Sequence, residues 1–161
     1  MLNIENPEKI KYIISDFDGI MTDNFVFISD SLEMSKKISY KDIMAIALLR
    51  KTNRNIIYIS GDKNPIIDML KDRFKLETSY QDIRKKIDVL KNIIKEYNLS
   101  QDEYIYIGDD VNDLECLEFA KNKITVPHAV NKVKEIENIQ ITEAAGGNGA
   151  FREVVDCILN T

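Results

Sequence analysis

The sequence predicts an α/β fold in which a parallel sheet is covered by helices on both faces. Short continuous runs rich in Ile, Val and Tyr alternate along the chain with longer segments of amphipathic pattern. Uninterrupted apolar strands are typical of a parallel sheet, because the helices that connect its strands bury both faces. The expected strands span residues 11–15, 55–60, 103–107 and 123–126, and the expected helices span residues 41–52, 65–74, 82–97, 113–120 and 149–159.

Residues 24–40, directly after the first expected strand, break this alternation. The letters FVFIS and LEMSKKIS flank a polar turn at residues 29–31, which predicts a β-hairpin. Nothing between the other elements is long enough to form a further domain. We therefore expect one domain over residues 1–161, without a large cap domain.

The later elements repeat the strand-to-helix pattern. The segments IIYISGD at 56–62 and YIYIGDD at 104–110 are interpreted as two strand-to-helix turns. Between them, one helix has apolar residues at helical spacing and Lys and Asp on its other side, as expected of a surface helix packed on a sheet. These apolar residues are Ile83, Ile87, Leu90 and Ile94.

Composition excludes several classes of function. The net charge of -5 argues against nucleic acid or an anionic membrane as the partner. Cys116 and Cys157 are too few for a disulfide framework and are interpreted as small buried residues in a reducing cytosol. The N-terminus lacks a signal-peptide pattern, and the most apolar stretch, residues 43–49, is far below the roughly 20 residues of a membrane span. We expect a soluble, cytoplasmic protein.

Four polar groups are expected at one edge of the sheet. They are Asp16-Phe17-Asp18-Gly19 after the first strand, Ser60-Gly61 after the second, Lys86 early in the helix over 82–97, and Gly108-Asp109-Asp110-Val111-Asn112-Asp113 after the third strand. In an open parallel sheet, ligands bind at the carboxyl ends of the strands. The sequence therefore predicts a ligand site at this edge.

The chemistry of these side chains fits the transfer of a phosphoryl group. Asp16 and Asp109 could supply carboxylates to Mg²⁺, which prefers oxygen ligands. Asp16 could also attack phosphorus, while Asp18 protonates the departing alkoxide and then activates water. Ser60 could hold phosphoryl oxygens and Lys86 could neutralise their charge.

Each group by itself also has an ordinary structural interpretation. The Asp16–Gly19 segment could be a solvated turn, Ser60-Gly61 a helix cap, and Lys86 part of a solvated helix face. The clustered carboxylates of residues 109–113 are less easily explained in this way, because they need a partner to be tolerated. The four groups together predict a Mg²⁺-dependent phosphomonoesterase.

The segment Asp16-Phe17-Asp18-Gly19-Ile20-Met21-Thr22-Asp23 resembles the first motif, D-x-D-G-[VI]-x-T-[DE], of the haloacid dehalogenase (HAD) superfamily of phosphohydrolases. Over residues 11–159 the chain is similar to its small capless group named for 3-deoxy-manno-octulosonate 8-phosphate phosphatase. The resemblance includes a C-terminal G-G-x-G-A-x-R-E at residues 146–153. It implies a Rossmann-like HAD fold and hydrolysis through an aspartyl-phosphate.

The resemblance also implies a role for each site residue. Asp16 would be the nucleophile and a metal ligand, and Asp18 the general acid/base and a ligand through its backbone carbonyl. Asp109 would bind the metal, and Ser60 and Lys86 the phosphate.

Further positions follow from the same likeness. Asp113 would orient neighbouring groups and Asp110 would hold a metal-bound water. Members of this group are similar in forming tetramers in which the hairpin and C-terminal tail help to close a neighbour's site. That makes residues 24–40 and Arg152 candidate intersubunit elements.

Departures from the octulosonate pattern bear on the substrate. Ser60-Gly61-Asp62-Lys63 stands where those enzymes have T-G-R, and so looks more like the nonulosonate 9-phosphate phosphatases. In that comparison Arg73 occupies a substrate-proximal position. The family's K-x-F-x-x-x-D-G-x-G is also altered, to Lys36-Lys37-Ile38 and Asp42-Ile43-Met44-Ala45. The expected substrate is a 2-keto-3-deoxy sugar acid phosphate with eight or nine carbons, from lipopolysaccharide or sialic acid biosynthesis.

Three alternatives remain open from the sequence. A receiver domain of two-component signalling also combines an acidic cluster, a hydroxyl residue and a Lys, but places them in a different order. A non-catalytic or phosphatase partner domain in an acylneuraminate cytidylyltransferase pathway is the second. A phosphomutase is the third, although no segment resembles a protective cap. His128, the only histidine, is interpreted as a loop residue.

Overall fold

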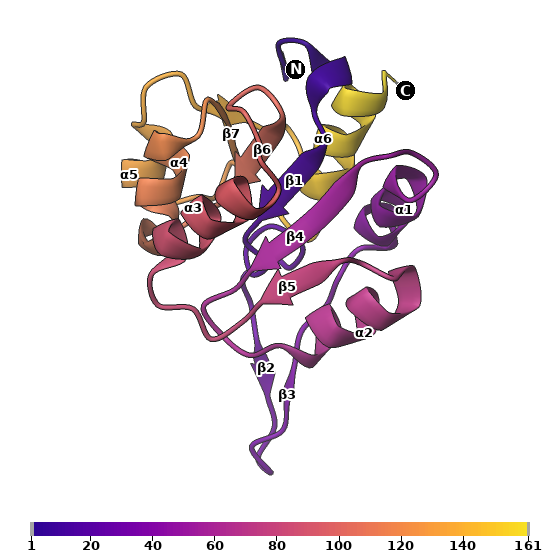
Figure 1. Cartoon of the computed structure of the whole chain (residues 1–161). Coiled ribbons are helices and arrows are strands. Elements are labelled where there is room, and N and C mark those ends of the chain that lie inside the picture. Colours follow the sequence, from indigo (N-terminus) through magenta and orange to yellow (C-terminus); the bar gives the residue numbers. More distant parts are fainter. Residues whose placement is uncertain (1, 161) are drawn as a thin grey trace.

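The computed structural model describes residues 2–160 and is built around a six-stranded parallel sheet (Figure 1). The spatial order of the strands is β5-β4-β1-β6-β7-β8, and each neighbouring pair is parallel. The strands are β1 (Tyr12–Ser15), β4 (Asn55–Ile59), β5 (Thr78–Tyr80), β6 (Tyr104–Ile107), β7 (Asn122–Thr125) and β8 (Gln140–Ile141). All four strands expected from the sequence are present, which confirms the predicted fold class.

The sequence did not predict β5 and β8, the two edge strands. Both are short, and their residues are intermediate or exposed rather than buried. A strand at the edge of a sheet needs no continuous apolar run, since fewer elements cover it. The periodicity that marks the inner strands is therefore missing from these two.

Helices cover both faces of the sheet, with α1, α2 and α6 on one face and α3, α4 and α5 on the other (Figure 1). Their bounds are α1 (Tyr40–Leu49), α2 (Pro65–Phe74), α3 (Lys86–Glu96), α4 (Leu114–Phe119), α5 (Asn131–Lys134) and α6 (Ala150–Leu159), with 3-10 helices at Pro7–Lys9 and Val111–Asp113. Within residues 2–160, no helix is both long enough and apolar enough to cross a membrane.

Helix α3 begins four residues later than expected, at Lys86 instead of residue 82. Asp82 has a left-handed φ of 58°, and the backbone N–H of Ile83 donates to the Ser60 carbonyl over 3.1 Å. These residues therefore form a loop tethered to the end of β4. Lys86 is consequently the first residue of the helix, at the carboxyl edge of the sheet.

Asp42 joins the two helices α1 and α6. Its buried carboxylate accepts hydrogen bonds from the backbone N–H of Gly149 at 3.0 Å and of Arg152 at 2.9 Å. A side chain of α1 thus caps the N-terminus of α6, where backbone donors have no partner within their own helix. This contact fixes the C-terminal helix against the face of the sheet.

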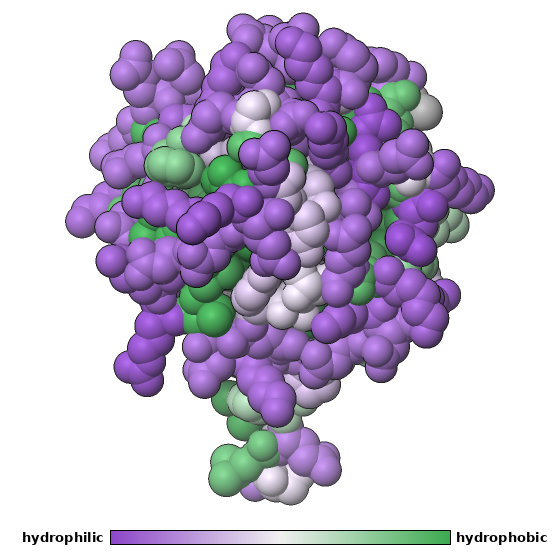
Figure 2. Space-filling model, in the orientation of Figure 1, coloured by the Kyte–Doolittle hydropathy of each residue, from purple (hydrophilic) through white to green (hydrophobic). Residues whose placement is uncertain are grey.

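The predicted hairpin is present as β2 (Phe27–Ile28) paired antiparallel with β3 (Met34–Ser35). It projects beyond the carboxyl edge of the sheet, and residues 2–160 contain no large cap domain (Figure 1). The space-filling view in Figure 2 shows apolar side chains gathered on this projection. The exposed apolar residues of residues 25–34 are Phe25, Val26, Phe27, Ile28, Leu32 and Met34.

Candidate active site

The order of the strands creates a crevice at the carboxyl end of β1. From β1 the chain runs outward through β4 to β5, and then crosses to the other side for β6, β7 and β8. Ligands bind at such a switch point in open α/β sheets, because the connections on its two sides lead in opposite directions. Asp16 follows β1 directly, Ser60 follows β4, and Asp109 lies two residues after β6. The sheet thus brings together the residues that the sequence places after separate strands.

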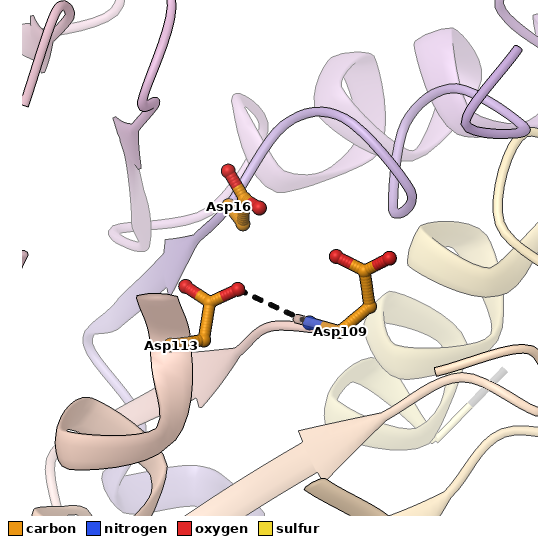
Figure 3. A group of neighbouring side chains, drawn as sticks. All are labelled: Asp16, Asp109 and Asp113. Carbon is orange, nitrogen blue, oxygen red and sulfur yellow. Dashed lines mark hydrogen bonds between the residues drawn. The ribbon is translucent and has the colours of Figure 1, made fainter. Parts of the chain in front are cut away.

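Three buried aspartates form a cluster in this crevice. Asp16, Asp109 and Asp113 each contribute a carboxylate oxygen, and these oxygens all lie within 4.8 Å of one another. Figure 3 shows the three side chains converging from the end of β1 and from the turn after β6. Asp113 differs from the other two because both of its oxygens accept hydrogen bonds from neighbouring groups.

These bonds make Asp113 an organising residue. Its Oδ1 accepts from the Tyr106 hydroxyl at 2.7 Å and from Lys86 Nζ at 2.9 Å. Its Oδ2 accepts from the backbone N–H groups of Asp109 at 3.2 Å and Asp110 at 3.4 Å, the first of which is drawn in Figure 3. Asp113 therefore ties the turn after β6 to Lys86.

Lys86 forms a buried ion pair with Asp16. Its Nζ lies 2.9 Å from Asp16 Oδ1, and its side chain is completely buried. The same oxygen accepts the backbone N–H of Phe17 at 2.7 Å, whereas no described residue donates to Asp16 Oδ2. Although burial lowers the pKa of Lys86, the Asp113 and Asp16 carboxylates outweigh it and raise the pKa. Lys86 is therefore a buried cation between two carboxylates. Oδ2 of Asp16 is the oxygen that is available to react with a ligand.

The remaining negative charge of the cluster calls for a second cation. Burial, together with repulsion from Asp113 and Asp110, raises the pKa of Asp109 to about 7. Burial and Asp113 likewise raise the pKa of Asp16 well above its usual value, against the opposing effect of Lys86. Such a set of crowded carboxylates suits a hard divalent metal with oxygen ligands.

The backbone around the cluster leaves little room for other side chains. Gly19 has a left-handed φ of 83°, and a Cβ at this position would overlap the Asp109 carboxylate. At Gly146 a Cβ would overlap the Gly19 carbonyl oxygen. The C-terminal glycine-rich segment predicted from the sequence therefore packs directly against the loop that follows β1. The donor set and this close backbone approach both fit a metal site.

Two residues at the base of the hairpin make contacts in the site that the sequence did not predict. Lys36 Nζ lies 2.7 Å from Asp18 Oδ2, while the Thr22 hydroxyl donates to Asp18 Oδ1 at 3.1 Å. Asn24 Nδ2 donates to Asp109 Oδ2 at 2.9 Å. The left-handed φ of 66° at Asn24 marks a turn that carries the amide back over the site. Lys36 opens the altered family pattern, but the sequence does not indicate its contact with Asp18 or that of Asn24 with Asp109, because both depend on how the hairpin folds back.

The cluster opens into a cavity of about 440 Å³. Its walls include the expected residues Asp16, Asp18, Ser60, Asp62 and Asp109. Ser60 is buried, and its Oγ accepts the backbone N–H of Asp62 at 3.3 Å, whereas the Asp62 side chain is exposed. Asp62 also lines two further cavities that extend beneath the hairpin. The cavity thus has a buried reacting end and an open end near Asp62.

Two expected substrate-binding residues are not brought to this cavity. Arg73 is exposed in the last turn of α2, with its guanidinium 5.3 Å from the centre of the Phe74 ring. Since α2 starts at the carboxyl edge and runs back along the sheet, its last turn lies away from the site. Arg152 lines a different cavity, and its Nε donates to Asp156 at 2.6 Å. Within one chain, neither arginine lines the cavity beside Asp16.

The chain is similar to known phosphohydrolases over nearly its whole length. The model of the haloacid dehalogenase-like hydrolase family matches residues 4–152. The chain is 27% identical over 152 residues to 3-deoxy-D-manno-octulosonate 8-phosphate phosphatase of Haemophilus influenzae, covering 94% of this chain and 84% of the relative.

Two solved structures share the fold. The same phosphatase from Moraxella catarrhalis, in complex with magnesium, phosphate and the octulosonate sugar, superposes with a TM-score of 0.88 at 26% identity, covering 96% of this chain and 88% of that one. A cobalt-bound phosphatase from Haemophilus influenzae gives a TM-score of 0.87 at 26% identity, covering 97% and 91%.

Proposed function

Because this chain belongs to the haloacid dehalogenase-like hydrolase family, as a phosphatase related to the octulosonate 8-phosphate enzymes, we propose that it hydrolyses a sugar acid phosphate through an aspartyl-phosphate on Asp16. One observation carries the proposal. The Asp16 carboxylate has one oxygen fixed by Lys86 and Phe17 and the other without a hydrogen bond from the described residues, at the buried end of a cavity. This is the arrangement that a carboxylate nucleophile requires.

In the first step, Asp16 Oδ2 attacks the phosphorus atom of the substrate. A bond forms between this oxygen and phosphorus, and the bond from phosphorus to the sugar oxygen breaks. Lys86 keeps the attacking carboxylate oriented through Oδ1, and Ser60 holds a phosphoryl oxygen. The departing alkoxide takes a proton from Asp18, which lines the same cavity.

In the second step, water attacks phosphorus and the bond to Asp16 breaks, which releases inorganic phosphate. Asp18 accepts the proton of the attacking water and is ready for another cycle. Thr22 and Lys36 each contact one oxygen of Asp18, so its carboxylate is held on the cavity wall through both steps. Asn24 orients Asp109 in the same way.

The proposed metal is Mg²⁺, held by the carboxylates of Asp16 and Asp109 and by the backbone carbonyl of Asp18. Bound there, a divalent cation neutralises charge on the transferring phosphoryl group and acts as a Lewis acid. The support is the crowded carboxylate set of this chain, together with one related structure that contains magnesium and another that contains cobalt. Asp113 is assigned an orienting role, since its oxygens already accept four hydrogen bonds.

The proposed substrate is a 2-keto-3-deoxy sugar acid phosphate, either octulosonate 8-phosphate or a nonulosonate 9-phosphate. Asp62 at the open end of the cavity favours hydroxyl or amine groups and disfavours a carboxylate. Both substrate classes carry a carboxylate, so the support for the nine-carbon class is the likeness of Ser60-Gly61-Asp62-Lys63 to the nonulosonate enzymes. Comparing the two substrate types at equal concentration tests the assignment, and a strong preference for the octulosonate would contradict it.

We also propose a homotetramer in which the hairpin of residues 24–40 covers a neighbouring subunit. The exposed apolar side chains of the hairpin support this assembly, because such a surface is normally covered. Arg73 and Arg152, which do not reach the cavity of their own chain, would then be candidates for a neighbour's site. Sedimentation should give a species near four times 18.6 kDa, and a monomer would refute the shared site.

The assay that tests the proposed activity is phosphate release from p-nitrophenyl phosphate, with Mg²⁺ and with a chelator. We expect turnover with Mg²⁺ and its loss in the chelator. Membership of the hydrolase family argues against the receiver domain. A complete lack of turnover on p-nitrophenyl phosphate and on all sugar acid phosphates would instead favour the non-catalytic partner of a cytidylyltransferase pathway.

A further inference from the structure

The wall of the catalytic cavity is acidic, although its proposed ligand is an anion. The carboxylates on this wall belong to Asp16, Asp18, Asp62, Asp109 and Asp110. A phosphate monoester brings further negative charge into the same space. One divalent cation would offset only part of this repulsion, so another positive group is needed at the cavity surface.

Lys86 can fill that role only in part. Its side chain is fully buried, it does not line the cavity, and its Nζ already lies 2.9 Å from both Asp16 and Asp113. Lys36 lies nearby but is paired with Asp18 at 2.7 Å. Part of the charge of both lysines is therefore already neutralised by carboxylates of the protein.

Arg84 is the only cation among the described residues that line this cavity. Its side chain is exposed and makes no hydrogen bond or ion pair with any residue between 2 and 160. The loop that carries it is fixed beside Ser60, because the N–H of the preceding Ile83 donates to the Ser60 carbonyl at 3.1 Å. Arg84 therefore stands on the same wall as the proposed phosphate-binding serine, with its guanidinium unpaired.

We propose that Arg84 binds the phosphoryl oxygens of the substrate, an inference that rests on the phosphatase function proposed above. A guanidinium can donate two parallel hydrogen bonds to a phosphate and stays charged throughout the neutral pH range. Arg84 thus supplies the positive charge that the cavity wall otherwise lacks. It acts in binding the substrate and in retaining inorganic phosphate, and takes no part in bond breaking.

The test compares Arg84→Gln with Lys85→Gln. Lys85 is the matched control, since it is the next residue, is exposed, pairs with Asp88 at 3.5 Å and does not line the cavity. The affinity for inorganic phosphate is measured by calorimetry in the presence of Mg²⁺, and kcat and KM are measured with p-nitrophenyl phosphate. Arg84→Gln should weaken phosphate binding and raise KM by about tenfold, as expected for one charge-assisted hydrogen-bonding group, with a smaller effect on kcat. Lys85→Gln should match the wild type, and Arg84→Lys should recover part of the loss.

Two results would overturn the assignment. Equal phosphate affinity in the wild type and Arg84→Gln would do so directly. A loss restricted to sugar acid phosphates, with p-nitrophenyl phosphate unaffected, would show that Arg84 contacts the sugar's carboxylate instead. Because phosphate binding is measured without turnover, an inactive wild type that binds phosphate through Arg84 would refute the proposed activity and leave this inference standing.

Discussion

Removal of the metal should change how the stability of this protein depends on pH. The prediction concerns Asp109, whose pKa is raised to about 7 by burial and by the carboxylates of Asp113 and Asp110, against a usual value of 3.8. A carboxyl whose pKa is raised by folding contributes stability below its unfolded pKa, and this contribution is lost as pH rises through the folded pKa. Metal-free protein should therefore lose stability between about pH 4 and pH 7.

The size of the effect follows from the shift. A difference of about 3 pKa units corresponds to at most about 4 kcal/mol in the free energy of unfolding. For a chain of this length, each kcal/mol moves the melting temperature by about 2–4 °C. Glu103, whose pKa is lowered from 4.5 to about 2 by Lys11, opposes this trend while its unfolded form still titrates, so the trend is read above about pH 5.5.

The assay is thermal unfolding from about pH 5 to pH 8, with a chelator and with Mg²⁺. With the chelator, the melting temperature should fall as pH rises, and Mg²⁺ should restore it most at the upper end, where Asp109 is ionised. Asp109→Asn should reduce both effects, and Asp16, whose pKa is also raised, accounts for the pH dependence that remains. A metal-free melting temperature that rises with pH through this range would refute the reasoning. So would Mg²⁺ stabilisation of equal size in the wild type and Asp109→Asn.

Three further predictions concern single side chains. Lys86→Gln should lower the free energy of unfolding, measured in urea, by about 3–5 kcal/mol, because Asp16 and Asp113 lose their buried cation. The exposed control Lys85→Gln should change it by less than about 0.5 kcal/mol. Equal effects of the two substitutions would contradict the role of Lys86. Asp42→Ala should cost about 1–3 kcal/mol by leaving the N-terminus of α6 uncapped, and an unchanged urea midpoint would contradict this. Asp62→Arg should alter the ratio of rates on eight- and nine-carbon substrates more than the rate on p-nitrophenyl phosphate. An equal loss of rate on every substrate would contradict the role of Asp62 in specificity.

The site residues that could be predicted are those that directly follow strands in the sequence. Asp16, Ser60 and Asp109 each follow an apolar run, and parallel strands end at a common edge, so their convergence could be inferred from the sequence. Lys36 and Asn24 could not be found in this way, because their contacts depend on how the hairpin folds back. The edge strands were missed because they lack an apolar run.

Arg73 and Arg84 illustrate two other limits. Arg73 was expected near the substrate by resemblance, but it lies eight residues beyond Pro65, which is about 12 Å along a helix that leaves the site. Helix direction alone could have placed it far from the carboxyl edge. Arg84 falls inside the expected helix over 82–97, where a charged residue is normally solvated. Only the later start of α3 puts it in a loop on the cavity wall.

The most direct test of the central claim is to locate the phosphoryl group during turnover. A substrate carrying a radiolabelled phosphoryl group is mixed with the enzyme and Mg²⁺, the reaction is quenched in acid, and labelled peptides are mapped. We predict label on Asp16 in the wild type and no covalent label in Asp16→Asn, which should remain folded and lack turnover. Label on another residue, or turnover by Asp16→Asn, would contradict the assignment of Asp16 as the nucleophile.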